Sequence, residues 1–277
     1  MSRLQAEWLK NLKQNIAAYE DDLRQKTGLD FPGIAARANG ISRDVICKAA
    51  QRSSIAVVTV TAGKGEIGGF AESVAAILSQ AGFRTRVMPQ TDVQGLYSAY
   101  TAPDIDFVFL ADDDTYMGLD LNRRRVSENS RATARGFVTV LEAMCPGGLL
   151  GKEVLVMGCG KVGTYATEDL LERGALPVLF DKSPAAQKLG EQMGLPLCLE
   201  REDIKHYFYL IDATNEGGWL TPDLLHEDAI IAAPGVPLSF TEASLAKHGD
   251  RLVHDLLHIG TLAMLGELCC GQITNKA

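Results

Sequence analysis

The sequence predicts an α/β protein built from two successive units, residues 1–150 and residues 151–277. In both units, short apolar runs of strand length alternate with stretches of helical periodicity, which is typical of a parallel sheet covered by helices. A glycine-rich loop follows the first predicted strand of each unit. Between the units, the segment CPGGLLGK at residues 145–152 contains a proline and three glycines, which indicate a domain boundary. The length agrees, since a domain averages roughly 150 residues.

The first unit opens with an amphipathic segment. Apolar residues recur at helical spacing from Leu4 to Leu23, so one helix is expected over residues 3–25. Its apolar stripe must cover something. The helix either packs permanently on its own domain or forms a mobile cover over a binding site.

The rest of the first unit alternates strands and helices. The predicted strands are residues 55–60, 85–88 and 106–110, and the predicted helices are residues 70–78, residues 93–100 and a segment that ends near Met144 after a polar stretch at 122–131. In open α/β sheets, ligands bind beyond the carboxyl ends of the strands. The glycine loop TAGKGEIGG at residues 61–69 and the acidic trio Asp112, Asp113 and Asp114 both fall at such ends.

The second unit continues the alternation. Its predicted strands are residues 153–157, 177–180, 207–211, 229–233 and 252–254, with helices over residues 164–173 and from Pro184 onward.

Composition and charge exclude several classes of protein. The net charge is −8, so the surface offers no basic footprint for nucleic acid but suits a small cationic substrate. No apolar run approaches the ~20 residues of a membrane-spanning helix, and the N-terminus lacks the apolar core of a secretory signal. We therefore expect a cytoplasmic protein without membrane or nucleic-acid partners. The six cysteines lack the spacing of a metal site or a disulfide framework, so reduced thiols and no metal are expected.

The second unit carries a dinucleotide-binding fingerprint directly after its first strand. In VLVMGCGKVG, Gly158 permits a tight turn, Gly160 lets the backbone approach a pyrophosphate, and Gly163 lets helix and strand pack closely. The N-terminus of the following helix presents free N–H groups and partial positive charge to the phosphates. This context predicts a C-terminal Rossmann-type dinucleotide-binding domain behind an N-terminal α/β substrate domain.

Asp181 predicts the choice of cofactor. It follows the next strand, 18 residues beyond Gly163, where a carboxylate hydrogen-bonds the adenosine ribose and repels a ribose 2′-phosphate. We therefore expect NAD rather than NADP, with Lys182 as the nearby cation that softens the preference. Asp181 can also cap the helix that starts near Pro184 without losing the ribose role.

Later strand ends complete the predicted cofactor site. The segments IDATN at residues 211–215 and APGVP at residues 233–237 are expected to wall the nicotinamide pocket, although such residues are also ordinary turn formers. The predicted cofactor contacts are Gly158, Cys159, Gly160, Lys161, Val162, Gly163, Asp181, Lys182, Ala213, Thr214, Asn215, Pro234 and Gly235.

The acidic trio at Asp112, Asp113 and Asp114 has three interpretations. Adjacent carboxylates at a strand end can hold Mg²⁺, cap a helix and order a loop, or receive an ammonium group. A dinucleotide domain in an acidic chain favours the last of these, and the other two stay open.

Several motifs resemble the PylD family of pyrrolysine-biosynthesis dehydrogenases. They are VTVTAGKGEIGGFAES at residues 58–73, DVQGLY at 92–97, FLADDDTYM at 109–117, GCGKVG at 158–163, APGVP at 233–237 and IGTLAML at 259–265. The resemblance runs in order along nearly the whole chain. Its glycine loop and its ADDD stretch are specific to that family, whereas GxGxxG is shared with many unrelated enzymes.

The resemblance implies an activity and a substrate site. It implies NAD-dependent oxidation of the terminal primary amine of 3-methylornithyl-N6-lysine to an imine, followed by loss of ammonia and ring closure to pyrrolysine. It also implies a homodimer with an N-terminal helix over the substrate. The substrate contacts that it implies are Leu4, Val60, Ala62, Ile67, Ala111, Asp112, Asn129 and Asp255, with Asp112 and Asp255 as the catalytic carboxylates.

Three positions depart from the family pattern. Ala62 stands where the family has a hydroxyl-bearing Ser, so a contact there is apolar or made by the backbone. Asp255 stands in place of the longer Glu and is expected to reach the substrate through water or a shifted backbone. His258 stands in place of Gly. Oxidation of an amine needs no acid to activate a carbonyl, so His254 and His258 are expected to be packed or solvated rather than catalytic.

Proton chemistry limits the mechanism. Hydride leaves only from a carbon that bears a neutral amine, yet the pKa of an alkylammonium lies near ~10.4. A carboxylate opposes loss of the proton and burial favours it. We expect Asp112 to bind and orient the amine, with the proton lost as the Leu4 helix closes, through Asp112 or water. The alternatives are a dehydrogenase of another small cationic substrate and a non-catalytic NAD-binding module.

Overall fold

The computed structural model describes residues 4–270, and its first unit is built on a mixed five-stranded sheet. The order across this sheet is β2 (Arg84–Val87), β1 (Ser54–Val58), β3 (Phe107–Ala111), β4 (Tyr116–Asp120) and β5 (Arg125–Glu128). The pairs β1–β2 and β1–β3 are parallel, as expected, but β3–β4 and β4–β5 are antiparallel. The expectation of a purely parallel sheet in this unit was therefore wrong. The acidic trio forms the turn of the β3–β4 hairpin, and the polar stretch at 122–131 contains β5.

Helices cover both faces of the first sheet. The helices α5 (Phe70–Gln80), α6 (Asp92–Thr101) and the long α7 (Asn129–Met144) contact its strands, whereas α3 (Phe31–Arg37) and α4 (Arg43–Arg52) pack mainly on other helices. The strands and helices predicted in this unit after residue 54 are all present within one or two residues of the expected bounds. The helices α3 and α4 were not predicted.

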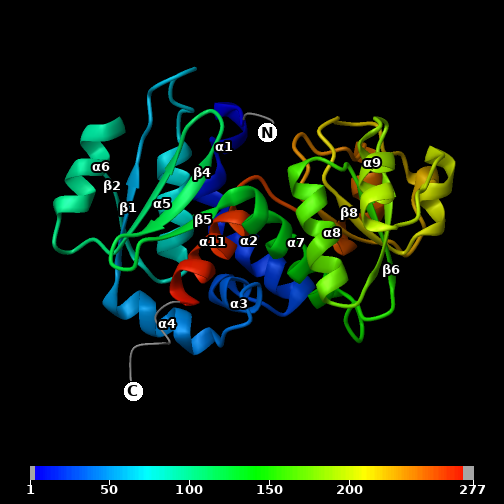
Figure 1. Ribbon diagram of the computed structural model, residues 1–277, viewed down its shortest axis with the longest axis horizontal. Coiled ribbons are helices and arrows are strands. Elements are labelled where there is room, and N and C mark those ends of the chain that lie inside the picture. The colour runs from blue at the N-terminus through cyan, green and yellow to red at the C-terminus, as the bar shows by residue number, and fades with distance from the viewer. Residues whose placement is uncertain (1–3, 271–277) are drawn as a thin grey trace.

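The single helix expected over residues 3–25 is two helices, α1 (Ala6–Leu9) and α2 (Leu12–Thr27). The break falls at Asn11, whose backbone has φ −108° and ψ 2°, a turn conformation that Asn favours. The left-handed Gly28 then ends α2. Residue 3 lies outside the described residues. The short helix α1 packs against α2 and α5, at the top of the molecule in Figure 1.

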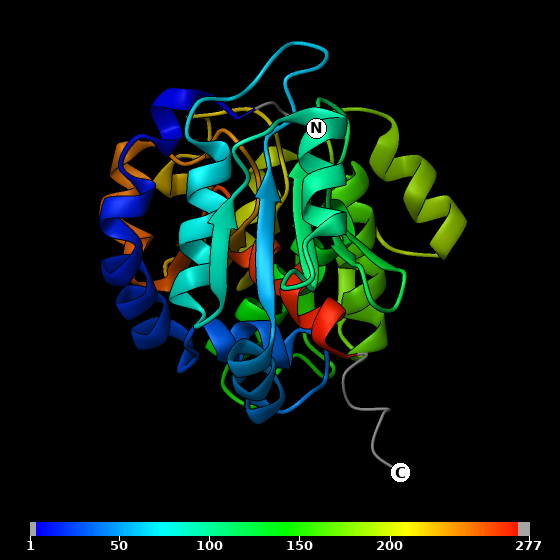
Figure 2. The same ribbon diagram turned by 90° about the vertical axis from the view of Figure 1, so that its left-hand side faces the viewer.

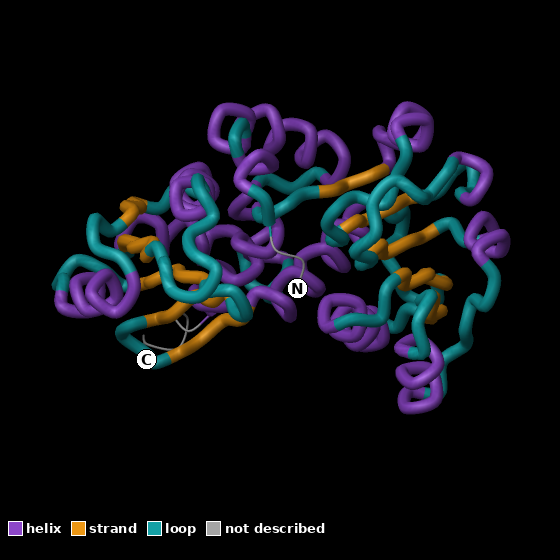
Figure 3. The backbone as a smooth tube through the Cα atoms, turned by 90° about the horizontal axis from the view of Figure 1, so that it is seen from above, coloured by secondary structure: helices purple, strands orange, loops and turns teal. Residues whose placement is uncertain are grey.

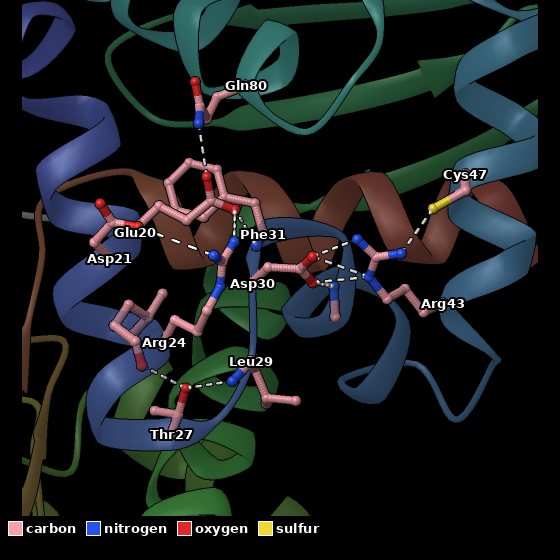
Figure 4. Close-up of polar contacts among 12 residues, drawn as sticks. Glu20, Asp21, Arg24, Thr27, Leu29, Asp30, Phe31, Arg43, Cys47 and Gln80 are labelled. Carbon is pink, nitrogen blue, oxygen red and sulfur yellow. Dashed lines mark hydrogen bonds and ion pairs between the residues drawn. The ribbon is translucent and has the colours of Figure 1, made fainter.

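A buried carboxylate ties these helices together. Glu20 of α2 accepts hydrogen bonds from the backbone N–H of Phe31, at 2.9 Å, and from the Gln80 side chain of α5, at 2.6 Å (Figure 4). Asp30, which directly precedes α3, caps that helix by accepting from the N–H of Gly33, and it pairs with Arg43 of α4. Buried polar groups hydrogen-bonded in this way fix the relative placement of α2, α3 and α5.

The second unit is a five-stranded, fully parallel sheet. Its order is β10 (Leu252–His254), β9 (Ile230–Ala233), β8 (Tyr209–Asp212), β6 (Glu153–Met157) and β7 (Leu176–Phe180), with helices α8 (Lys161–Glu172), α9 (Ala185–Met193) and α10 (Glu242–His248). An isolated parallel bridge joins Leu179 to Leu197 beyond the edge strand β7. This is the strand order of a Rossmann sheet with its third strand reduced to a bridge.

The two units meet along helices in the middle of the molecule. The last helix, α11 (His258–Cys270), leaves the second sheet after β10 and packs on α3, α5 and α7 of the first unit. Helix α7 packs against α8, so α7, α8 and α11 lie between the two sheets in Figure 1. Figure 2 looks onto the first unit, with β1 and β2 in front, and Figure 3 shows the strands of each half flanked by helices. A division at residue 150 thus assigns α11 to the second unit by sequence, although it packs on the first.

Within residues 4–270, no helix is both long enough and apolar enough to span a membrane.

Candidate functional site

One cleft of about 770 Å³ lies between the carboxyl ends of the two sheets. From the first unit it is lined by the ends of β1 and β3, the glycine loop and the start of α7. From the second unit it is lined by the loops after β6, β7, β8, β9 and β10. Of the predicted site residues, the cleft is lined by Leu4, Val60, Ala62, Ile67, Ala111, Asp112, Asn129, Gly158, Gly160, Lys161, Val162, Asp181, Lys182, Ala213, Thr214, Asn215, Pro234, Gly235 and Asp255.

The fingerprint glycines have the geometry that dinucleotide binding requires. Gly158 has φ +87°, and a Cβ on it would lie 2.7 Å from the Ala213 carbonyl group. A Cβ on Gly163 would lie 1.8 Å from the Gly158 oxygen, because α8 packs directly on the turn. A Cβ on Gly160, in contrast, would meet nothing within 4 Å. The backbone at Gly160 therefore faces open cleft beside the N-terminus of α8, where a pyrophosphate binds in this fold.

Two predicted cofactor residues, Cys159 and Gly163, do not line the cleft. Cys159 is buried, and burial together with the nearby Asp181 carboxylate raises the pKa of its thiol to about 12. Its contribution is its backbone N–H, which donates to Asp181 at 2.7 Å. Asp181 also accepts from the N–H and the hydroxyl of Ser183 at 2.8 Å, so this carboxylate orders the turns that flank the cleft.

The glycine loop is held by two carboxylates. Asp92 accepts hydrogen bonds from the Thr61 N–H, the Thr61 hydroxyl and the Ala62 N–H, and these bonds lower its pKa to about 2. Asp113 accepts from the N–H of Lys64 at 2.7 Å. Because the Ala62 N–H is engaged by Asp92, it is not available to donate to a ligand in the cleft.

Asp112 is exposed at the hairpin turn. Its Oδ1 accepts from the N–H groups of Asp114 and Thr115 at 2.9 and 2.7 Å, and these bonds lower the pKa of the carboxyl group. Loop ordering, one of the open interpretations of the trio, therefore holds for Asp112 and Asp113. Among the described residues, no cluster of three or more His, Cys, Asp or Glu side chains could hold a metal ion.

Asp255 is buried at the opposite wall and caps α11. Its carboxylate accepts from the N–H groups of Leu257 at 2.5 Å, His258 at 2.6 Å and Ile259 at 2.9 Å. Burial alone would raise its pKa, but the neighbouring His258 ring, together with these N–H groups, holds the pKa below its usual value. Asn129, at the start of α7, also lines the cleft and accepts from the Thr133 hydroxyl at 3.1 Å.

Sequence reasoning missed an aromatic corner of the cleft. Arg201 lies over the Trp219 ring, 4.8 Å from its centroid, and Trp219 stacks near Phe180 at 6.4 Å. The indole N–H of Trp219 is buried without a hydrogen-bond partner among the described residues. All three side chains line the cleft beside Asp181. No motif or spacing connects Arg201 with Trp219, so only the fold brings them together.

The fold and the cleft define the class, an α/β protein of two units whose second unit has a Rossmann-type sheet. Two solved shikimate dehydrogenases share this architecture. The enzyme from Aquifex aeolicus is 15% identical, with a TM-score of 0.52 over 82% of this chain and 93% of that one. The enzyme from Thermus thermophilus, in complex with NADP(H) and shikimate, is 20% identical, with a TM-score of 0.50 over 81% of this chain and 94% of that one.

Sequence comparison shows which family this chain resembles. Residues 8–127 match the family described as pyrrolysine biosynthesis protein PylD, N-terminal domain. The chain is 27% identical to the pyrrolysine synthase of Methanosarcina acetivorans, over 96% of this chain and 98% of that protein. It is 25% identical to the pyrrolysine synthase of Methanosarcina barkeri, over 96% and 97% respectively. The resemblance to the PylD family indicated by the motifs is thus confirmed.

Proposed function

We propose that this chain is an oxidoreductase of pyrrolysine biosynthesis that oxidises the terminal amine of 3-methylornithyl-N6-lysine to an imine with NAD. Loss of ammonia and ring closure then give pyrrolysine. The observation that carries the proposal is the shared cleft, in which the dinucleotide fingerprint faces two ionised carboxylates suited to a cationic substrate. The similarity to pyrrolysine synthases along 96% of the chain supports the choice of substrate. We also propose that the protein acts in the cytoplasm as a homodimer.

The residues of the second unit that line the cleft fit NAD. The open space at Gly160 and the free start of α8 suit the pyrophosphate, and Asp181 suits an unphosphorylated ribose. The residues that would hold NAD are Gly158, Gly160, Lys161, Val162, Asp181, Lys182, Ala213, Thr214, Asn215, Pro234 and Gly235. When bound, NAD supplies the hydride acceptor. The Thermus thermophilus neighbour is in complex with NADP(H), so Asp181 is the basis for choosing NAD here.

The chain's own carboxylates bind and orient the substrate rather than take its proton. The N–H groups of Asp114 and Thr115 lower the pKa of Asp112, which makes this carboxylate a good ammonium acceptor and a poor base. Asp255 is likewise a good ammonium acceptor and a poor base, because its pKa is also lowered. Proton loss therefore goes to water, promoted by desolvation of the amine against Leu4, Val60 and Ile67. These side chains exclude water from the reacting carbon.

The proposal is tested by adding NAD and the synthetic isopeptide to the purified chain. NADH is followed by its near-ultraviolet absorbance and pyrrolysine by mass spectrometry, and both are expected in equal amounts. NADH formation only with other amines or alcohols would indicate a different substrate. NAD binding without turnover of any such compound would indicate a non-catalytic module.

An Asp112→Asn variant tests the substrate contact. Asn keeps an oxygen for the N–H groups of Asp114 and Thr115, so the turn is retained while the charge is removed. Turnover is expected to fall about 100-fold, because a charge-assisted hydrogen bond contributes roughly 1.5–3 kcal/mol. The matched control is Asp104→Asn, which removes an exposed partner of Arg86 on the same unit and should leave turnover unchanged. Full turnover in Asp112→Asn would refute the assigned role.

A further inference from the structure

The start of α11 carries a buried polar cluster behind the cleft wall. The ring of His258 stacks on Tyr19 of α2, with centroids 4.2 Å apart and planes at 27°, and it packs at a tilt against Phe31 of α3, at 5.9 Å. His258 is only 6% exposed. Phe31 is in turn fixed by the bond from its N–H to Glu20 (Figure 4). Three helices therefore hold the imidazole in one orientation.

The polar atoms of this cluster lack ordinary partners. Both ring nitrogens of His258 and the hydroxyl of Tyr19 are buried, and none makes a well-formed hydrogen bond within residues 4–270, although burial and the nearby Asp255 carboxylate raise the pKa of Tyr19. A buried, unpaired polar atom costs free energy, so each such case calls for a reason. A purely structural ring stack would be served better by Phe.

The nearest charged group to the imidazole is a substrate-site carboxylate. Nδ1 of His258 lies 3.4 Å from Oδ1 of Asp255, just beyond a well-formed hydrogen bond. That Oδ1 already accepts from the N–H groups of Leu257 and His258, while Oδ2 accepts only from Ile259. Oδ2 therefore accepts fewer backbone hydrogen bonds than Oδ1 does.

We propose that His258 is a positioning residue for Asp255, holding Oδ1 so that Oδ2 receives a primary ammonium group of the substrate. Tyr19 and Phe31 fix the imidazole ring with its Nδ1 3.4 Å from Oδ1. When the ammonium binds Oδ2, a small movement of the carboxylate brings Oδ1 into line with the Nδ1–H and completes a hydrogen bond. This inference rests on the proposed function, since it assigns a task to Asp255 in binding that substrate.

Electrostatics agree with this arrangement. The pKa of the buried Asp255 is lowered because the neighbouring His258 ring and the α11 N–H groups outweigh the burial that would raise it. A donor that favours the charged form of Asp255 also favours its contact with a cation.

Three variants separate positioning from packing. His258→Phe keeps the ring stack and removes both nitrogens, whereas His258→Asn loses the stack but places an amide N–H close to the position of Nδ1. The control is His248→Phe in α10, because His248 is likewise fully buried with both nitrogens unpartnered among the described residues, but it lies outside the cleft. For each variant we measure KM for the isopeptide, kcat, the Kd for NAD from Trp219 fluorescence, and Tm.

His258→Phe is expected to raise KM for the isopeptide about tenfold, with kcat, the Kd for NAD and Tm close to wild type. His258→Asn is expected to restore KM while lowering Tm, and His248→Phe is expected to affect Tm alone. A wild-type KM in His258→Phe, or equal rises in KM in both His258 variants, would overturn the proposal.

A nitrogen NMR measurement separates failure of this inference from failure of the proposed function. With ¹⁵N-labelled histidine, His258 is expected to carry its proton on Nδ1 and to lose that preference in Asp255→Asn. If the wild type does not oxidise the isopeptide, the proposed function fails. The nitrogen signal of His258 then still shows whether His258 and Asp255 interact. No change in the His258 signal in Asp255→Asn would show that the two side chains are not coupled.

Discussion

Asp112 and Asp255 illustrate how backbone N–H groups determine what a carboxylate can do. Asp112 is exposed and Asp255 is buried, yet both have lowered pKa values because each accepts from successive N–H groups of a turn or a helix start. A carboxylate with a raised pKa would suit general base chemistry. These two suit the binding of positive charge instead, which agrees with the net charge of −8 and with the cationic substrate that we propose.

Asp255→Asn gives the first prediction, a loss of stability that depends on pH. The folded-state pKa of Asp255 lies below the unfolded value, so its stabilisation is complete above that unfolded value and is lost as pH falls through the folded one. Asn lacks this contribution. Asp255→Asn should be about 2 kcal/mol less stable than wild type at pH 7, and the gap should shrink below about pH 4. Urea unfolding across this pH range measures it, and a gap that stays constant well below that pH would contradict it.

The fingerprint glycines give a second prediction, in which two similar substitutions separate fold from binding. Gly163→Ala places a methyl group 1.8 Å from the Gly158 oxygen, so α8 must move and stability should fall by about 3 kcal/mol. Gly160→Ala meets nothing within 4 Å, so Tm should stay near wild type while the Kd for NAD rises. Thermal unfolding and NAD titration check both. Wild-type NAD affinity in Gly160→Ala would place the pyrophosphate elsewhere.

At the scale of elements, the glycine loop depends on carboxylates from two other segments. Asp92, at the start of α6, accepts three hydrogen bonds from Thr61 and Ala62, and Asp113, in the β3–β4 turn, holds Lys64. The loop itself contains three left-handed glycines, Gly63, Gly65 and Gly69, which give it little stiffness of its own. Its shape at the substrate wall is therefore imposed from outside.

Asp92→Ala tests this dependence and gives the third prediction. The variant frees the N–H groups of Thr61 and Ala62, so KM for the isopeptide should rise several-fold while the Kd for NAD and Tm change little. Amide hydrogen exchange should speed up in residues 61–66 and not in α5. Asp44→Ala, which removes an exposed helical partner of Lys48, is the control. Unchanged exchange in the loop would show that Asp92 does not hold it.

The sequence predicted best where a pattern is local. The GCGKVG turn was predicted from the spacing of its glycines, because a tight turn requires glycine at fixed positions. The apolar strands were predicted from their composition, because buried strands require apolar residues. The β4–β5 hairpin was missed because β5 exposes Arg125 and Val126, so it shows no apolar run. The capping role of Asp255 was missed because it depends on where α11 begins. The Arg201–Trp219 pair depends on two loops meeting in space, which no local pattern encodes.

At the scale of the whole molecule, the cleft depends on how the two units are joined. Helix α7 contacts α3 and α11 on the side of the first unit, and α8, β8 and β9 of the second unit. It therefore supports both walls of the cleft. Where α7 and α8 meet, Arg173 at the end of α8 donates to Glu142 and Thr139 of α7 and to Asp169 of its own helix, at 2.8 to 2.9 Å. The Arg173 side chain is only 18% exposed. Charged groups removed from water in this way are sensitive to the loss of one partner.

Arg173→Met gives the fourth prediction. Met keeps most of the packing volume but leaves Glu142 with Arg37 as its remaining partner. Asp169 loses its ion pair with Arg173, and burial already raises the pKa of Asp169, so its charged form is further disfavoured. Stability should fall by about 2 kcal/mol, whereas Arg251→Met, which breaks an exposed pair with Asp228, should cost less than about 1 kcal/mol. Urea unfolding followed separately through Trp8 in the first unit and Trp219 in the second measures both variants. Because α7 is shared, both tryptophans should report the same lowered midpoint in Arg173→Met. A shift seen by Trp219 alone would mean that the units unfold independently and that the cleft is held together by something other than the α7–α8 contact.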